Sequence, residues 1–138
     1  MKTWLVDTGP LVAYLDRRDP SHEQVVARLD AFNGRLITTA AVVTEAMHLV
    51  GAAPAGPRLL AELIVASGTR VHDFSQAGDL WAAVELMEKY ADTPMDYADA
   101  TLLLLADRSK VRDIATLDRR GFSVYRTAGG KATRLVLD

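Results

Sequence analysis

The chain has 138 residues, 49% of them hydrophobic and 25% charged, a balance that excludes a disordered or fibrous protein and is typical of one globular domain. It contains no cysteine, so disulfides, thiolate catalysis and zinc–thiolate sites are excluded. No apolar run approaches the roughly 20 residues of a membrane-spanning helix, and no signal peptide opens the sequence. We therefore expect a single cytoplasmic domain over residues 1–138, with no membrane partner.

The net charge of −2 conceals an uneven distribution along the chain. Residues 1–107 contain 8 Lys and Arg against 15 Asp and Glu, whereas residues 108–138 contain 8 against 3. A basic segment beside an acidic body can attract a polyanion toward groups that hold a metal ion. A solvated basic tail would have the same composition, so charge alone leaves both interpretations open.

Short apolar strands and helices alternate along the sequence. In chain order we predict a strand at 3–6, a helix over 20–32, a strand at 36–38, helices over 40–50 and 59–66, a strand at 70–74, helices over 79–91 and from about 96 through the leucines, and strands at 112–116 and 123–125.

Local signals support these assignments. Gly9-Pro10 indicates a break after the first strand. Asp19-Pro20 predicts a helix start, with a capping side chain before a proline. Leu80, Val84 and Met87 recur at helical spacing and predict an amphipathic helix.

This alternation predicts an α/β fold in which helices cover both faces of a mostly parallel sheet. Ligands bind such sheets beyond the carboxyl ends of the strands. Asp7 follows the first predicted strand, and Asp118 lies just beyond the strand at 112–116. Either aspartate could instead be a turn or cap residue.

Three further carboxylates stand at unusual places. Glu45 is the only charged residue of its apolar helix, and a buried glutamate needs a partner such as a cation unless it lies on an exposed helix edge. Asp96 and Asp99 are three residues apart at a helix start, where Asp96 can cap the helix and Asp99 can favour its positive end. If the sheet gathers these acids, oxygen ligands of this kind suit Mg²⁺ or Mn²⁺.

The acids occur in segments that together resemble the PIN-domain ribonucleases, and within that family the VapC-like toxins of toxin–antitoxin pairs. Trp4–Leu11 resembles the first acidic motif, a hydrophobic strand that ends in Asp-Thr. Thr44–Ala46 is similar to the second motif and Met95–Leu103 to the third, whose acid precedes a small residue and an apolar helix. Ala115–Phe122 resembles the fourth, Thr-x-Asp followed four residues later by phenylalanine. All four occur in order over nearly the whole chain.

The resemblance implies a three-layer α/β/α fold and a Mg²⁺- or Mn²⁺-dependent endoribonuclease that hydrolyses RNA phosphodiester bonds. The implied metal-binding and catalytic residues are Asp7, Glu45, Asp99 and Asp118. The family pattern has one acid where this chain has two, and we assign the ligand to Asp99 because it precedes the small residue and the leucine run.

The resemblance also implies outer-shell groups and partners. Asp96 is expected to act as a cap or outer-shell carboxylate, and the hydroxyls of Thr8 and Thr116 can orient a carboxylate or a water. Arg119 and Arg120 are expected to contact the RNA backbone, which positions RNA without selecting its sequence. Family members form homodimers and are silenced by a cognate antitoxin, and we expect both partners here.

Other classes of protein fit parts of the sequence. Asp7-Thr8-Gly9 also matches the aspartic-protease triplet, but that enzyme needs two such aspartates and a β-rich fold. Glu45 and His48 have the Glu-x-x-His spacing of di-iron bundles, without the second such motif. A catalytically inactive PIN scaffold and an RNA-processing PIN nuclease outside a toxin pair remain as alternatives.

Overall fold

The computed structural model describes all 138 residues and contains one central sheet of five parallel strands in the order β3-β2-β1-β4-β5. The strands are β1 (Thr3–Val6), β2 (Arg35–Thr39), β3 (Arg70–His72), β4 (Asp113–Ala115) and β5 (Arg134–Leu135). Leu5 at the centre of the sheet pairs with Ile37 of β2 and Ile114 of β4. The prediction of a mostly parallel sheet is confirmed, since every strand pairing is parallel.

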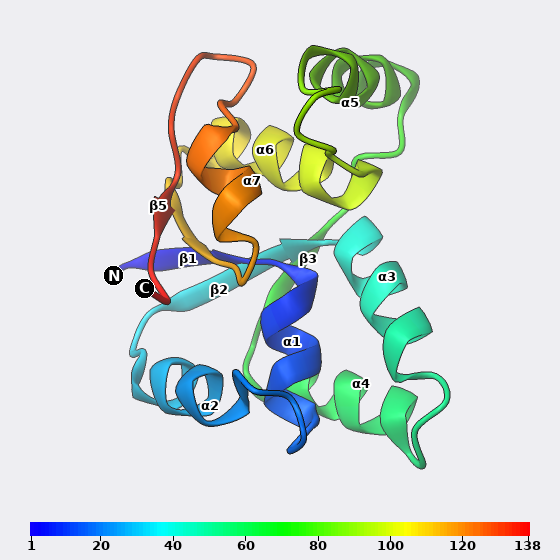
Figure 1. Ribbon diagram of the computed structural model, residues 1–138, viewed down its shortest axis with the longest axis vertical. Helices are drawn as coiled ribbons and strands as arrows, with labels where there is room; N and C mark the ends of the chain where they lie inside the picture. Colours follow the sequence, from blue (N-terminus) through cyan, green and yellow to red (C-terminus); the bar gives the residue numbers. More distant parts are fainter.

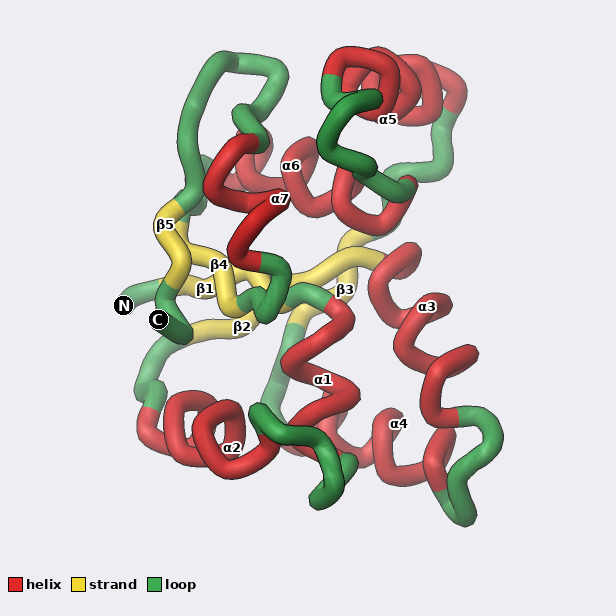
Figure 2. Tube along the Cα trace, in the orientation of Figure 1, coloured by secondary structure: helices red, strands yellow, loops and turns green.

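Seven helices surround the sheet. They are α1 (Thr8–Leu15), α2 (His22–Ala31), α3 (Ala40–Val50), α4 (Gly56–Ala66), α5 (Ala77–Lys89), α6 (Tyr97–Ser109) and α7 (Arg119–Val124). Figure 1 shows α1, α2 and α4 below the sheet and α5, α6 and α7 above it, and α3 extends from the end of β2. Figure 2 shows the same three layers by type of structure. None of the helices is both long and apolar enough to cross a membrane.

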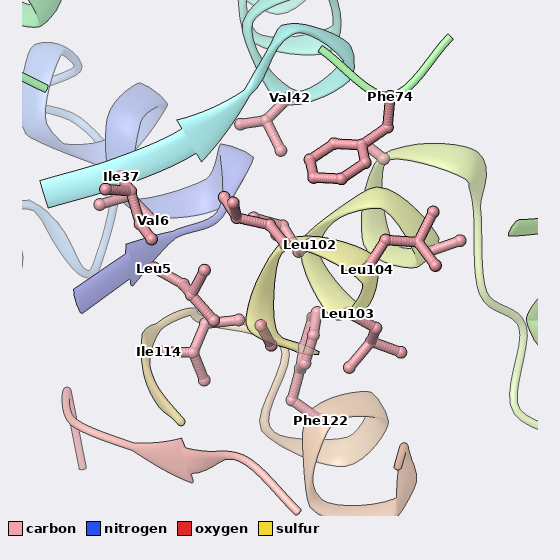
Figure 3. Close-up of a cluster of buried hydrophobic side chains, with 14 of the residues drawn as sticks. Leu5, Val6, Ile37, Val42, Phe74, Leu102, Leu103, Leu104, Ile114 and Phe122 are labelled. Carbon is pink, nitrogen blue, oxygen red and sulfur yellow. The ribbon is translucent and has the colours of Figure 1, made fainter. Parts of the chain in front are cut away.

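The core lies on both faces of the sheet. On one face the buried leucines of α6 pack against Leu5 and Ile114 of the sheet and Phe122 of α7 (Figure 3). On the other face Trp4 and Ala115 pack with Val25 of α2, and the Trp4 ring stacks on Phe32 with the ring centroids 3.8 Å apart. These faces alternate along β1, as the side-chain period of a strand requires.

Two predicted features at the start of the chain are wrong in detail. Gly9-Pro10 does not form an irregular break after the strand, because α1 begins at Thr8 and includes both residues. A proline in the first helical turn removes an N–H that has no intrahelical acceptor anyway. The second helix begins at His22 rather than at Pro20, and the Asp19 side chain accepts a hydrogen bond from the Ser21 N–H in the preceding turn.

The predicted strand at 123–125 is also wrong, because these residues form the end of α7 and its C-cap. The last strand is instead β5, ten residues further along and only two residues long. In α5 the predicted helix is present, but most of its apolar stripe does not face the core. Leu80 and Val84 are exposed and Met87 alone of the stripe packs partly against the core, whereas Ala83 and Leu86 are buried.

Candidate active site

The strand order reverses between β1 and β4, at the centre of the sheet. The chain runs from β1 outward to β2 and β3, then crosses to β4 on the other side of β1. The crevice beyond the carboxyl ends of two such strands is the usual ligand site of an open α/β sheet. Asp7 follows β1 and Asp118 follows β4 by three residues, and the Asp7 N–H donates to the Ala115 carbonyl at 3.0 Å.

Asp7 is buried and fixed by two hydrogen bonds. As the N-cap of α1, its Oδ1 accepts from the Thr8 N–H at 2.8 Å, and its Oδ2 accepts from the Thr116 hydroxyl at 2.8 Å. Burial nevertheless raises the pKa of Asp7 to about 6, against the lowering effect of these bonds, and the carboxylates of Asp96 and Glu45 add to the rise. These two hydrogen bonds therefore orient both carboxylate oxygens of Asp7, and burial makes its charged form less favourable.

Thr116 connects Asp118 to Asp7, and Gly121 holds the Asp118 side chain. The Asp118 N–H donates to Thr116 Oγ1 at 3.0 Å, so one hydroxyl links the backbone of Asp118 to the carboxylate of Asp7. Asp118 Oδ1 accepts from the Gly121 N–H at 3.0 Å and caps α7. A Cβ on Gly121 would lie 2.3 Å from Asp118 Oδ2 and 2.9 Å from the Tyr125 ring, so glycine permits this close turn.

Asp96 and Asp99 form a capping box at the start of α6. Asp96 Oδ1 accepts from the Asp99 N–H at 2.8 Å, and Asp99 Oδ2 accepts from the Asp96 N–H at 3.2 Å. The pKa of Asp99 rises to about 8, foremost through burial and then through the negative charges of Asp7 and Asp96. Helix capping therefore accounts for the spacing of the two acids, and it also places both near Asp7.

Glu45 approaches from α3 and is half-buried. Its pKa is raised, mainly by loss of water around the carboxylate; the Thr8 hydroxyl opposes the rise, and Asp96 adds to it. We call Asp7, Glu45, Asp96 and Asp99 the acidic cluster, because each of them perturbs or is perturbed by another member. None of the five salt bridges in the molecule involves a member of this cluster.

Tyr125 is a site neighbour that the sequence did not reveal. Its ring is fully buried, and its hydroxyl donates to the Pro94 carbonyl at 2.5 Å and the Thr93 carbonyl at 3.1 Å. Burial, then the charges of Asp99 and Asp118, raises its pKa to about 12. Tyr125 therefore ties the end of α7 to the loop before α6 and feels the charges of both Asp99 and Asp118.

The sequence pattern of the PIN domain matches residues 4–128, which include every acid described above. The chain belongs to the PIN-domain family. This confirms the family resemblance.

Individual relatives of this PIN domain point to one branch of the family. Ribonuclease VapC26 of Mycobacterium tuberculosis is 35% identical over 127 residues, covering 91% of this chain and 94% of that protein. The sarcin–ricin-loop-cleaving toxin VapC20 of the same organism has a similar fold, with a TM-score of 0.75, 17% identity and coverage of 83% and 89% of the two chains.

A second fold match is FitAB bound to the IR36 DNA fragment, with a TM-score of 0.64, 22% identity and coverage of 97% of this chain and 95% of that one. These similarities extend along almost the whole PIN domain.

The donor groups of this PIN domain fit a hard divalent cation, although no three acidic or histidine side chains are arranged to hold one as they stand. The cluster offers only carboxylate oxygens, which Mg²⁺ and Mn²⁺ prefer. Its members are held together without a basic partner, at the cost of raised pKa values for Asp7, Glu45 and Asp99. The hydroxyl oxygen of Thr8 is buried beside them and lowers the pKa of Glu45.

The two arginines that follow Asp118 differ in their surroundings. Arg119 forms a salt bridge with Asp138 near the end of the chain. Arg120 is exposed and forms no salt bridge or side-chain hydrogen bond in the PIN domain. Arg120 is therefore the freer of the two cations.

Proposed function

We propose that this PIN domain is a Mg²⁺- or Mn²⁺-dependent endoribonuclease and the toxin of a toxin–antitoxin pair. The observation that carries the proposal is a cluster of carboxylates without a basic partner at the switch point of the sheet, in a chain 35% identical to a VapC ribonuclease. Carboxylates brought together in this way repel one another, and a cation among them relieves the repulsion.

Asp7, Glu45, Asp99 and Asp118 are the proposed metal-holding residues, directly or through water. Each keeps free lone pairs after its structural hydrogen bonds, since a carboxylate has about four acceptor sites. Asp96, Thr8 and Thr116 would orient them: Thr116 by its bond to Asp7, Asp96 by capping Asp99, and Thr8 by its buried hydroxyl beside Glu45.

The bound cation supplies a water of lowered pKa and neutralises charge on the phosphoryl oxygens. Among the chain's own residues, Asp7 and Thr116 are buried, and Tyr125 holds the two acid-bearing segments against each other. Because water rather than the ribose 2′-hydroxyl would attack, the expected products carry a 5′-phosphate and a 3′-hydroxyl. Products with 2′,3′-cyclic phosphate ends would contradict this chemistry.

Arg120 and, after release from Asp138, Arg119 are the proposed contacts to the RNA backbone. Arg120 has no ion-pair partner to give up, whereas Arg119 must exchange one anionic partner for another. Neither contact selects a sequence.

We further propose a homodimer and an antitoxin partner. The exposed apolar side chains of α5 support self-association, since Trp81 is 70% exposed, Leu80 45% and Val84 38%. The similarity to VapC proteins supports an antitoxin, whose gene we expect beside the gene of this chain. Co-expression of the two should give a stable complex that lacks nuclease activity.

The first test is a calorimetric Mn²⁺ titration of the wild type, Asp99→Asn and Asp92→Asn. Asp92 is exposed and outside the acidic cluster, so Asp92→Asn controls for the loss of one negative charge. We expect binding by the wild type and Asp92→Asn and at least a tenfold loss in Asp99→Asn. Equal binding by all three proteins would overturn the metal assignment.

The second test separates an enzyme from an inactive scaffold. Asp7→Asn should abolish RNA cleavage with its fold intact, because Asn keeps the shape and one carbonyl oxygen of the side chain but not its charge. If the wild type binds Mn²⁺ and RNA yet cleaves none of the tRNA, rRNA and mRNA pools, the scaffold alternative replaces the proposal.

A further inference from the structure

An open hollow of about 340 Å³ lies beside the acidic cluster, between α3 and the start of α6. The first turns of these two helices lie next to each other (Figure 1). Its lining is Ala41, Thr44, Glu45, Asp96, Tyr97 and Ala98. Two of these residues belong to the acidic cluster, so the hollow and the cluster share a wall.

The aromatic wall of the hollow is rigid. Tyr97 is the first residue of α6, directly after the capping residue Asp96, and its hydroxyl donates to the Phe74 carbonyl at 2.6 Å. A ring anchored at its backbone and at its hydroxyl presents a fixed, half-buried face.

The other walls are small. Ala41 and Ala98 contribute methyl groups. Thr44 donates its hydroxyl to the Ala40 carbonyl at 3.0 Å, so this hydroxyl is already engaged within α3. No basic residue lines the hollow, so a phosphate or an acidic peptide would meet only the carboxylates of Glu45 and Asp96. A flat, uncharged group suits an aromatic face opposite small side chains.

We propose that this hollow binds one unpaired nucleobase of the RNA strand, stacked on Tyr97, next to the phosphate that is cleaved. The inference rests on the proposed ribonuclease function, and it names the substrate form: a single strand or loop. Aromatic rings stack with any base, while a base within a helix is already stacked and unavailable. The wall shared with the acidic cluster places a base beside a phosphate held there.

The test measures RNA binding in the Asp7→Asn background, which prevents cleavage. The probes are a single-stranded RNA oligonucleotide of mixed sequence that contains 2-aminopurine, and the same oligonucleotide in a duplex. Fluorescence anisotropy reports affinity, and 2-aminopurine emission reports stacking. Tyr97→Leu, introduced into the Asp7→Asn variant, should weaken single-strand binding about 5- to 100-fold and remove the emission change. Tyr97→Phe should retain both, and duplex binding should be weak in all variants.

Two further variants provide a second disruption of the hollow and a control away from it. Thr44→Phe fills the hollow from its exposed side without touching the core, and it should weaken single-strand binding as Tyr97→Leu does. Tyr14→Leu removes a tyrosine on α1, in the opposite layer of the fold, and should change nothing.

The outcomes separate this inference from the proposed function. If Mn²⁺ binding and RNA binding are present but Tyr97→Leu and Thr44→Phe bind RNA like their parent, the nucleobase site is wrong and the nuclease proposal stands. If Mn²⁺ binding is absent from the wild type, the proposed function fails first. If a hexa-arginine peptide displaces the RNA and its binding requires Glu45 and Asp96 but not Tyr97, the hollow is a cationic-peptide site and the nucleobase proposal is overturned.

Discussion

Several residues of the candidate site have two roles, because side chains that form the acidic edge also cap the N-termini of helices. Asp7 caps α1, Asp96 caps α6 and Asp118 caps α7, each by accepting a backbone N–H. Capping satisfies N–H groups that have no intrahelical partner, and the positive end of a helix favours a nearby anion. The caps therefore offset part of the cost of gathering carboxylates at one edge.

Gly121 gives a residue-scale prediction. Gly121→Ala places a methyl group against the Asp118 carboxylate and the Tyr125 ring, so we expect RNA cleavage to fall at least tenfold and the protein to lose about 1–3 kcal/mol of unfolding free energy. The measurements are a cleavage assay and urea unfolding.

Gly78→Ala is the matched control. Gly78 lies in the first turn of α5, where a Cβ would meet nothing within 4 Å. Alanine should therefore leave activity unchanged and stabilise the protein by up to about 1 kcal/mol. Equal behaviour of the two variants would show that the Gly121 turn does not position Asp118.

Much of the site could be predicted at this scale. Asp7 and Asp118 were predictable because they follow apolar strands, and carboxyl ends of parallel strands share an edge. The capping role of Asp96 followed from its spacing to Asp99 and is confirmed. Tyr125 and Gly121 were not predictable as site neighbours, since their importance lies in packing between segments far apart in the chain.

Among the elements, strands and long helices were easier to predict than short helices. β1 and α3 have the predicted bounds, because unbroken apolar runs define both. Residues 123–125, the end of α7 and its C-cap, were assigned as a strand because Val124 and Tyr125 are β-prone, whereas the Asp118 cap and the Tyr125 anchor fix a helix. For α5 the helix was predicted but its buried face was not. Its most regular apolar stripe is largely exposed, and its buried stripe includes the charged Asp79.

The pairing of Asp79 with Arg108 gives a prediction for the α5–α6 contact. The Asp79 side chain is 7% exposed and pairs with Arg108, whose guanidinium also lies over the Phe74 ring, 4.7 Å from its centroid. Arg108→Met leaves a buried carboxylate without its partner, so we expect a loss of about 1–3 kcal/mol in urea unfolding.

Arg18→Met is the control for this pair. Arg18 contacts Asp16 on the surface, with 92% and 41% of the two side chains exposed, so its removal should cost less than about 0.5 kcal/mol. The double variant Asp79→Asn/Arg108→Met should be more stable than Arg108→Met alone. If it is not, the ion pair does not hold α5.

The exposed face of α5 gives a prediction about assembly. Trp81→Glu puts a charge on the proposed interface, so a wild-type dimer should become a monomer in sedimentation equilibrium. Val65→Glu makes the same kind of change on α4, in the other helical layer, where Val65 is 79% exposed, and should leave the dimer intact. Dissociation by Val65→Glu but not by Trp81→Glu would place the interface elsewhere.

For the whole molecule, the acidic cluster predicts how stability depends on pH. The pKa values of Asp7 and Asp99 rise from an ordinary 3.8 to about 6 and about 8, so between pH 4 and 8 the metal-free folded protein binds more protons than the unfolded chain. Its unfolding free energy must then fall as pH rises through this range. We expect Tm in EDTA to drop by several degrees from pH 5 to pH 8.

Mn²⁺ should reverse much of this loss at pH 8 and have little effect at pH 5, because protons compete with the ion for the carboxylates. Asp7→Asn removes one of the titrating groups and should flatten the profile in EDTA, whereas Asp92→Asn should not. A Tm in EDTA that climbs from pH 5 to pH 8 would contradict the assignment of the cluster.

The sheet order has a consequence for how the protein is made. Asp7 precedes its neighbours Ala115, Thr116 and Asp118 by more than one hundred residues along the chain, and β4 must pair with β1 before they meet. A ribosome-bound chain that stops short of β4 leaves one edge of β1 unpaired and holds only part of the acidic edge. Translation itself therefore delays the assembly of this site until β4 has been synthesised.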